Sequence, residues 1–321
     1  MRLAWPLKSR KNNDQNAEDG CSLAADPRPD FLCVGAQKAG TSWLYEQLAG
    51  HPDFWMPPLK ELHYFDQLSR IPAVASARER DKRDHHFIEN IKRLSGRSHL
   101  DLEEYAQLFA PKGSLLSGDI TPAYSMLNDE VIERIVSHFP NLKVIFLARD
   151  PVERAWSQLS MGVRLRNISP FNTSDAHEVI RNLLDPGVLL RSHPSKAVAR
   201  WKRYVHPNLF RVYFFDDLQT DPAELRRSIV LFLGGDPKKS NGWLDAHQNS
   251  NAGKDKPRLT AKVRSRIAEF FERELKACAK ELGGPARHWP ARYGFSIFCL
   301  FLQLADYFDL FGWFDLDCLT L

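Results

Sequence analysis

The sequence predicts an α/β protein in three layers, with a central parallel sheet flanked by helices. Short, mainly apolar runs at residues 31–34, 144–147 and 210–215 have the length and composition of buried strands. Segments in which apolar residues recur with helical spacing lie between these runs. A chain whose strands alternate with helices builds a parallel sheet that is covered by helices on both faces. With 321 residues, of which 43% are hydrophobic, the chain is sufficient for a sizeable core.

The first half of the chain is predicted to contain helices separated by a proline-rich loop. A helix follows the first strand, from residue 41. Prolines at 52, 57 and 58 prevent regular helix, so residues 60–66 are expected in a loop or short turn. The mixed-charge run 76–93 predicts a solvated helix, and residues 101–110 predict a short helix capped by Asp101.

The second half is predicted to continue the alternation. Helical spacing extends over 131–140, and a further helix begins at Pro151, a favourable first helical position. Residues 165–195 contain Asn, Ser, Thr and three prolines, and are predicted to form an irregular surface insertion. Residues 223–232 are predicted to form a helix that two glycines end, and residues 259–282 a single long amphipathic helix.

Three regions are expected along the chain. Residues 1–30 are polar and lack periodicity, which predicts a disordered or loosely attached tail. Residues 31–290 contain the strands and helices and form the folded domain. Residues 291–321 are unusually apolar and aromatic, and we expect them to pack on the domain or to bind a partner or a membrane surface. Asp306 and Asp309 interrupt this segment and argue against a membrane span.

Composition excludes several classes of protein. The formal net charge of +4 does not predict a nucleic-acid-binding protein, although it allows a local basic pocket. The five cysteines contain no C-x-x-C pair, which argues against a disulfide framework or a zinc site. The basic first ten residues are not followed by a long apolar region. We therefore expect no signal peptide or N-terminal anchor, and a cytoplasmic location.

The first predicted strand leads into a loop with the properties of an anion site. The segment from Gly35 to residue 42 reads GAQKAGTS, and the next helix starts at its end. Loop N–H groups and the positive end of a helix both attract an anion, and Lys38 adds a mobile cation. Lys38 precedes Gly40, which differs from a Walker A loop, and the dinucleotide-binding pattern G-x-G-x-x-G is absent. The alternative is an ordinary strand-to-helix turn with a solvated lysine.

A second anion site is indicated at the end of the strand 144–147. Arg149 follows this strand, at the edge of the sheet where ligands of open α/β folds bind. Ser157 lies on the following helix, on a face with Arg154, Gln158 and Met161. Arginine and serine donors suit a phosphate, although a surface ion pair between Arg149 and the next residue is the simpler alternative.

Together, the two motifs resemble those of the sulfotransferases that use 3′-phosphoadenosine 5′-phosphosulfate (PAPS). The loop matches G-x-Q-K-x-G-T-S, and the second segment matches R-[DN]-P-x-x-R-A-x-S. The resemblance covers roughly residues 31–282 and implies a P-loop-like fold. It places the 5′-phosphosulfate among Lys38, Ala39, Gly40, Thr41, Ser42 and Trp43. It also places the 3′-phosphate at Arg149 and Ser157, and Gly253 and Lys254 in a loop that closes over the nucleotide.

The general base is implied by a further resemblance. Residues 60–66, KELHYFD, are similar to the K-E-x-x-F-F segment of heparan-sulfate-type and bacterial sulfotransferases, in which the Glu accepts the proton. Glu61 is therefore the first candidate. His63 is the second, because its ordinary pKa lies nearer neutrality, and its alternative role is to support a neighbour.

One segment departs from the heparan-type pattern. In residues 118–124, GDITPAY, Ile120 stands where those enzymes carry a lysine, which argues against a glycosaminoglycan acceptor. Asp119 and Tyr124 are expected to line the acceptor site. The apolar C-terminal segment and four aromatic residues favour a lipidic or aromatic small molecule over a carbohydrate acceptor. These aromatic residues are Phe54, Trp55, Tyr64 and Phe65.

The expected reaction is in-line transfer of a sulfuryl group from PAPS to an acceptor hydroxyl or amine, which leaves adenosine 3′,5′-bisphosphate. Glu61 accepts the acceptor proton, Lys38 stabilises charge on the bridging oxygen, and no metal is required. Two alternatives remain open at this point. One is a nucleotide-dependent phosphotransferase, and the other is a catalytically inactive scaffold with a nucleotide-binding fold.

Overall fold

The computed structural model describes residues 26–67, 77, 79–94, 99–169, 171–239, 245–247 and 258–296. Within these residues, four strands form one parallel sheet in the order β2-β1-β3-β4. The strands are β1 (Phe31–Gly35), β2 (Gly118–Ile120), β3 (Lys143–Ala148) and β4 (Phe210–Phe214). The predicted strands at 31–34, 144–147 and 210–215 are confirmed, each to within about one residue.

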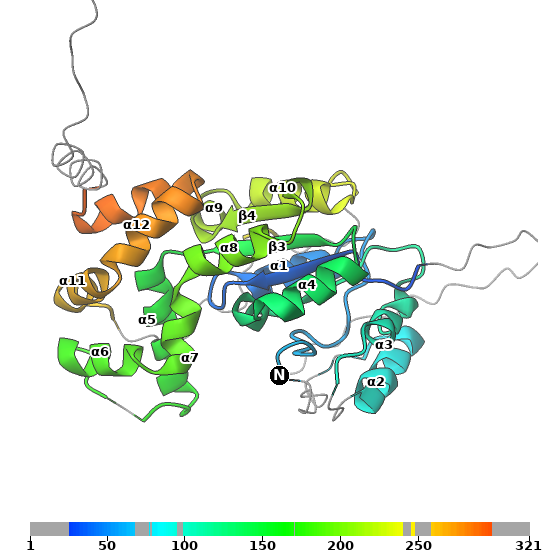
Figure 1. Ribbon diagram of the computed structural model, residues 1–321, viewed down its shortest axis with the longest axis horizontal. Helices are drawn as coiled ribbons and strands as arrows, with labels where there is room; N and C mark the ends of the chain where they lie inside the picture. The colour runs from blue at the N-terminus through cyan, green and yellow to red at the C-terminus, as the bar shows by residue number, and fades with distance from the viewer. Residues whose placement is uncertain are drawn as a thin grey trace, which may run out of the picture.

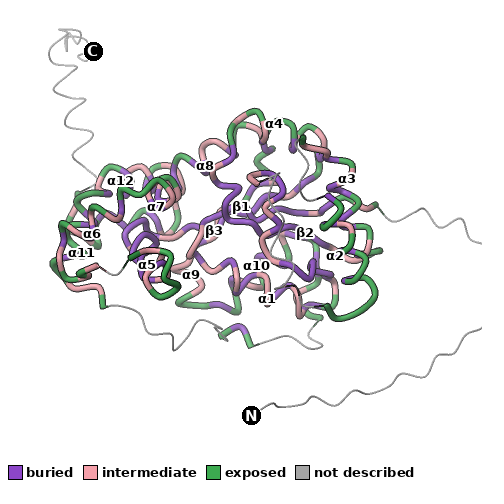
Figure 2. The backbone as a smooth tube through the Cα atoms, turned by 90° about the horizontal axis from the view of Figure 1, so that it is seen from below, coloured by how far each residue is buried: buried purple, intermediate pink, exposed green. Residues whose placement is uncertain are grey.

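Helices cover both faces of the sheet (Figure 1). Figure 2 shows the strands between two helical layers, with α4 and α8 on one side and α1 and α10 on the other. These four helices are α1 (Thr41–Ala49), α4 (Asp129–His138), α8 (Pro194–Lys202) and α10 (Pro222–Leu233). The predicted three-layer α/β architecture is therefore confirmed.

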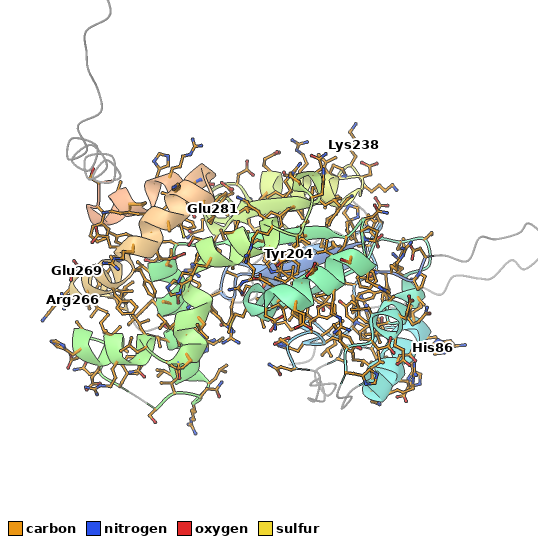
Figure 3. The ribbon with its side chains drawn as sticks, in the orientation of Figure 1. His86, Tyr204, Lys238, Arg266, Glu269 and Glu281 are labelled. Carbon is orange, nitrogen blue, oxygen red and sulfur yellow. The ribbon has the colours of Figure 1, made fainter. Side chains whose placement is uncertain are left out.

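The other helices lie mainly at the two ends of the sheet (Figure 1). They are α2 (Lys82–Leu94), α3 (Leu102–Gln107), α5 (Pro151–Arg164), α6 (Ala176–Leu183), α7 (Pro186–Leu189), α9 (Phe215–Thr220), α11 (Ala261–Phe270) and α12 (Glu272–Glu281). Short 3₁₀ turns connect them, including η3 (Pro122–Met126), η4 (Leu190–Ser192) and η7 (Pro290–Tyr293). Figure 3 shows side chains such as His86, Lys238 and Arg266 extending from the outer surface of these helices and loops.

The inner strands β1 and β3 are buried along almost their whole length. Leu32 pairs with Val144 on one side and with Asp119 of β2 on the other. Full burial of each large apolar side chain stabilises the folded state by roughly 1.5–3 kcal/mol. Strands that are buried on both faces are therefore continuous apolar runs in the sequence. Because all four strands are parallel, β1, β3 and β4 end at the same edge of the sheet.

Local capping signals set several helix ends as predicted. Asp101 accepts a hydrogen bond from the Glu104 amide at the start of α3. The Asp150 carboxylate accepts a hydrogen bond from the Val152 amide, and Pro151 is the first residue of α5. Helix α10 ends at Gly234, whose φ of 101° is a left-handed conformation that glycine adopts without strain.

The prediction of an irregular insertion at 165–195 was wrong. The segment contains α6, α7, η4 and the start of α8. Its prolines do not break these helices, because Pro186 and Pro194 occupy the first helical turn, where a missing N–H is not needed. Val179, Leu183 and Val188 are buried, so packing against the domain stabilises short helices that the local sequence does not favour strongly.

The prediction of one long helix at 259–282 was also wrong. The helix is interrupted at Phe271, which separates α11 from α12. Helix α11 packs against α6, whereas α12 packs against α8. The change of direction at Phe271 buries its ring and lets each half cover a different part of the domain. In the sequence, the two halves look like one helix, because no glycine or proline marks the interruption at Phe271.

Several predictions fall partly or wholly outside the described residues. Residues 1–25 and 297–321 are outside them, so the tail, the apolar C-terminal segment and its contact with a partner or membrane stay predictions. The start of the predicted helix 76–93 is partly outside them too, and α2 begins at Lys82. Among the residues that are described, we find no helix of the length and apolarity that a bilayer span requires.

Arg154 on α5 is an internal link rather than a surface cation. Its side chain is fully buried, and its Nη1 donates to Gln158 Oε1 at 2.7 Å. Its Nη2 donates to the Val188 carbonyl at 3.1 Å and to the Ser192 hydroxyl. Burial, with the nearby charges of Arg191 and Arg149, lowers the pKa of Arg154 to about 9. Arg154 and Gln158 thus join α5 to α7 and η4.

We predict that Arg154→Met lowers the free energy of unfolding by about 1–3 kcal/mol, because it leaves buried acceptors without a donor. Urea unfolding followed by circular dichroism measures the change. Arg203→Met is the control, since Arg203 pairs with Asp129 at the exposed surface and its removal is expected to change stability by less than about 0.5 kcal/mol. Equal stability of the two variants would show that the buried contacts of Arg154 do not stabilise the fold.

Candidate active site

A cavity of about 580 Å³ lies where the chain leaves the carboxyl ends of β1, β3 and β4. The loop after β1 and the start of α1 contribute Lys38, Gly40, Thr41, Ser42 and Trp43 to its wall. Arg149 after β3, Ser157 on α5 and Phe215 after β4 line it as well. Glu61 reaches the wall from the loop that precedes α2. The volume lies within the range of about 300–1,000 Å³ that is usual for small-molecule sites.

Gly40 gives the loop after β1 the form of an anion cradle. It is the N-cap of α1 with a φ of 96°, and no side chain caps the helix. No acidic residue occupies the first turn, so the amides and the positive helix end are available to an anion. This φ strains any residue with a side chain, and a Cβ atom at Gly40 would also lie 2.6 Å from Leu218 Cδ2, so both observations favour glycine.

Lys38 connects this loop to the neighbouring strand end. Its φ of 71° is a left-handed conformation, which is unusual for a residue with a side chain. Its carbonyl accepts a hydrogen bond of 2.7 Å from Arg149 Nη1. Its Nζ lies 3.3 Å from the Met161 sulfur, and a thioether is a weak acceptor that an anionic oxygen would replace as a partner.

Arg149 is held in place by its surroundings but keeps unused hydrogen-bonding capacity. Its guanidinium carbon lies 4.2 Å from the centre of the Phe215 ring. Its Nε is buried and has no hydrogen-bond partner among the described residues. Burial lowers the pKa of Arg149, and nearby carboxylates oppose this effect. A guanidinium is not deprotonated in proteins, so the side chain is a cation. A buried donor without a partner is costly, and a bound anion would satisfy it.

The loop with Glu61 forms a chain of alternating charges. The Lys60 ammonium pairs with one Glu61 oxygen, and His63 Nε2 lies 3.6 Å from the other. His63 Nδ1 lies 2.9 Å from Asp66 Oδ2. Glu61 and His63 both have left-handed backbones, with φ of 65° and 54°. The loop therefore depends on contacts outside itself to keep this conformation.

These contacts fix the protonation states of Glu61 and His63. Burial would raise the pKa of Glu61, but His63 and Lys60 outweigh it and lower the value to about 2. Asp66 and then Glu61 raise the pKa of His63 to about 9, against the effect of burial. At neutral pH, Glu61 is thus an anion that is able to accept a proton, whereas His63 is a cation without a free lone pair.

The charges on the cavity wall favour an anionic ligand. Three cationic side chains line the cavity, those of Lys38, Arg149 and Arg164. Among the described residues of the wall, the carboxylate is that of Glu61. The cations belong to three segments, the loop after β1, the end of β3 and the end of α5. An anion with groups at two separated positions would satisfy both the α1 start and Arg149.

Comparison with known families agrees with this geometry. The model of the sulfotransferase family matches residues 29–236, which is more than half of the 321 residues. The chain belongs to the sulfotransferase family. The sulfotransferase resemblance of the two motifs is thereby confirmed.

The individual relatives of the chain are distant. It is 31% identical over 144 residues to the membrane-associated sulfotransferase kil1 of Dictyostelium discoideum, a match that covers 44% of this chain and 25% of that protein. It is 23% identical over 325 aligned positions to the bifunctional heparan sulfate N-deacetylase/N-sulfotransferase 4 of Mus musculus, which covers 88% of this chain and 34% of that protein. The chain thus spans only a quarter to a third of the length of these relatives.

A solved structure shares the fold of the chain. The crystal structure of a sulfotransferase from Alicyclobacillus acidocaldarius superposes with a TM-score of 0.58 and 23% identity. The match covers 82% of this chain and 98% of that one. This likeness confirms the P-loop-like α/β fold.

The structure brings most of the sequence-predicted site residues together. The cavity wall includes Lys38, Gly40, Thr41, Ser42, Trp43, Glu61, Arg149 and Ser157. Ala39 is fully buried beneath the loop, and His63 contacts Glu61 without lining the cavity. Gly253 and Lys254 lie outside the described residues. The individual roles of all these residues stay predictions.

The prediction that Asp119 and Tyr124 line the acceptor site was wrong, whereas the class of acceptor stays a prediction. Asp119 and Tyr124 do not line the cavity, because both are buried and bonded to each other at 2.7 Å. The four aromatic residues that favoured an aromatic or lipidic acceptor are core residues, each at most 5% exposed. They are Phe54, Trp55, Tyr64 and Phe65. Their side chains stabilise the fold and carry no information about the acceptor.

Sequence reasoning missed several residues of the wall. Phe215 follows β4 as Arg149 follows β3, so the strand-end rule that identified Arg149 applies to it equally. Arg164 lies seven residues after Ser157 on α5 and thus on the same face. Ala246 and His247 carry no such signal, since they reach the wall through a long-range bond of 2.9 Å from Trp43 Nε1 to the Ala246 carbonyl.

We predict that the His63 ring titrates with a pKa near 9, which proton NMR of the ring measures directly. Because this value lies above the ordinary one of about 6.5, the ion pairs of His63 stabilise the fold fully below pH 6.5. That stabilisation is lost as the pH rises through 9. Asp66→Asn is the matched change, since it keeps the side-chain shape and is expected to lower the pKa of His63. A wild-type pKa near 6.5 would contradict the charge arrangement.

Proposed function

We propose that the protein is a PAPS-dependent sulfotransferase in which Glu61 is the general base. The observation that carries the proposal is the meeting of three features at one cavity. These are the uncapped start of α1 with Lys38, the ionised carboxylate of Glu61, and the buried Nε of Arg149, which has no hydrogen-bond partner within the described part of the chain. The donor supplies a sulfuryl group on a good leaving group, and the protein supplies positioning and charge.

The two basic regions suit the two anionic groups of PAPS. The first-turn amides of α1 and the Lys38 ammonium would hold the 5′-phosphosulfate, as an uncapped helix start favours. Arg149 and Ser157 would hold the 3′-phosphate, which would accept a hydrogen bond from the buried Arg149 Nε. Gly253 and Lys254 remain proposed nucleotide contacts on the strength of the family resemblance.

The proposed reaction requires little rearrangement of the protein. As the acceptor oxygen or nitrogen forms a bond to sulfur, the bond from sulfur to the bridging phosphate oxygen breaks, and its electron pair stays on that oxygen. The acceptor proton passes to Glu61, which is ionised at neutral pH. Lys38 stabilises the negative charge that develops on the leaving group. The low pKa of Glu61 makes it a weak base, so the proton moves as the new bond forms rather than before it.

The acceptor is proposed to be a hydroxyl or amine of a small molecule or carbohydrate. Similarity to a heparan sulfate N-sulfotransferase supports a carbohydrate amine. The replacement of the heparan-type lysine by Ile120 argues against it, since Ile120 is buried and provides no charge. We also propose a cytoplasmic location, which favours small metabolites of the cell interior as acceptors.

Nucleotide preference tests the donor assignment. We predict that adenosine 3′,5′-bisphosphate stabilises the full chain against heat without Mg²⁺, and far more than 5′-AMP does. Arg149→Gln and Ser157→Ala should each weaken binding of the bisphosphate by roughly 10- to 100-fold, since hydrogen bonds to charged groups contribute about 1.5–3 kcal/mol. Binding of 5′-AMP should change little. Calorimetric titration gives the affinities, with Arg203→Gln as the surface control.

Two outcomes would contradict the donor assignment. One is an equal loss of affinity for both nucleotides, which would show that Arg149 and Ser157 do not recognise the 3′-phosphate. The other is a requirement for ATP with Mg²⁺, which a phosphotransferase would show. Incubation with ³⁵S-labelled PAPS and panels of hydroxyl and amine acceptors then identifies the acceptor by mass.

The variant Glu61→Gln tests the proposal that Glu61 is the general base. We predict that it lowers the transfer rate by about 10²–10⁴-fold while nucleotide affinity stays unchanged, because the amide keeps the shape but accepts no proton. His63→Gln should cost less, since His63 is already protonated at neutral pH. Single-turnover rates at saturating PAPS measure both variants. If Glu61→Gln stays active and His63→Gln does not, His63 is the base.

A further inference from the structure

Asp119 is a buried carboxylate that the proposed chemistry does not use. It lies in β2 and is 1% exposed. Its Oδ1 accepts from the Thr121 hydroxyl at 2.7 Å, and its Oδ2 accepts from Tyr124 at 2.7 Å and from Tyr105 at 3.2 Å. The backbone amide of Leu62 donates to it as well. A buried carboxylate with this many donors is a fixed anchor for whatever is bonded to it.

The contacts of Asp119 lead directly to the loop with Glu61. Leu62, which follows Glu61, donates its amide to Asp119. The amide of Tyr64, which follows His63, donates to the Tyr124 hydroxyl at 3.0 Å. That hydroxyl in turn donates to Asp119, so both loop amides are held by the same carboxylate.

The two amides are placed where the loop needs support. Glu61 and His63 have the left-handed backbones, and each precedes one of the anchored amides. Without such bonds, the loop would relax toward ordinary backbone angles and carry the Glu61 carboxylate away from the cavity wall. Such a shift matters, because misplacing a reacting group by about 1 Å costs roughly 100-fold in rate.

We propose that Asp119 and Tyr124 are positioning residues, which hold the Leu62 and Tyr64 amides so that Glu61 faces the acceptor. This inference rests on the proposed role of Glu61 as the base. It adds a function to a carboxylate that contacts neither the cavity nor the nucleotide motifs. Asp119 acts through hydrogen bonds to the backbone, and Tyr124 relays the second of them.

Tyr105 provides a matched control for Tyr124. Both tyrosines are fully buried, both donate to Asp119 Oδ2, and both rings pack on Phe65 with centroid distances of 4.5 and 4.9 Å. The two hydroxyls differ in one respect. The Tyr124 hydroxyl accepts a hydrogen bond from a loop amide, whereas the Tyr105 hydroxyl accepts none from the residues that the structure describes. A purely structural role for the cluster would make Tyr105→Phe and Tyr124→Phe equivalent.

The experiment compares these two variants in the full chain at saturating donor and acceptor. Tyr124→Phe is expected to lower kcat by about 10- to 100-fold, whereas Tyr105→Phe should change it by less than about threefold. The affinity for adenosine 3′,5′-bisphosphate should be the same in both, because neither residue lies near the nucleotide motifs. Equal kcat values for the two variants, whether both low or both normal, would overturn the proposal.

A second measurement does not depend on sulfuryl transfer. The pKa of the His63 ring, measured by NMR, reports whether the loop keeps His63 beside Glu61 and Asp66. Tyr124→Phe is expected to move that pKa toward its ordinary value, and Tyr105→Phe to leave it unchanged. If the wild type transferred no sulfuryl group, the proposed function would fail while this measurement still decided the positioning role. Unchanged His63 pKa values in both variants would refute that role.

Discussion

The hydrogen bond from Arg149 to the carbonyl of Lys38 joins the two segments on which the cavity depends. It is possible because β1 and β3 are neighbouring parallel strands that end at the same edge of the sheet. The left-handed backbone of Lys38 presents its carbonyl to that bond, and Gly40 then starts α1 without a side-chain cap. The cation–π contact with Phe215 adds the end of β4. Contacts within the protein thus fix three strand ends relative to one another, and such preorganisation reduces the ordering cost of binding.

The acidic side of the cavity is organised on a different principle. The loop with Glu61 follows no strand directly, and its shape comes from buried hydrogen bonds and from aromatic packing beneath it. Its charges alternate along the chain, so each is compensated by a neighbour rather than by a ligand. On the basic side of the cavity, in contrast, none of the residues that the structure describes accepts a hydrogen bond from Arg149 Nε. This asymmetry separates the tasks of binding an anion and of accepting a proton.

The sequence analysis correctly predicted those elements of the fold whose ends are determined by neighbouring residues in the chain. The apolar runs of β1 and β3, Pro151 at the start of α5 and Gly234 at the end of α10 are each recognisable from neighbouring residues. The helices within 165–195 and the interruption at Phe271 depend on packing against distant elements, which periodicity does not reveal. The same distinction applies to the site. Lys38 and Arg149 occur in contiguous motifs, whereas the burial of Asp119 and Tyr124 depends on Tyr105 and on the loop at 60–66. From the sequence alone, an aromatic residue such as Trp55 cannot be assigned to the core or to a pocket, because the assignment depends on its neighbours in space.

The ionisation of Glu61 has a consequence for how the acceptor controls the reaction. With a Glu61 pKa of about 2 and a His63 pKa of about 9, neither group titrates over the pH range in which most cells live. The pH response of catalysis then comes from the acceptor itself. An amine has to lose its ammonium proton before it attacks sulfur, so its sulfation becomes faster with rising pH. An alcohol is already neutral, and its sulfation is nearly insensitive to pH in that interval. The slope of activity against pH therefore reveals the chemical nature of the atom that receives the sulfuryl group.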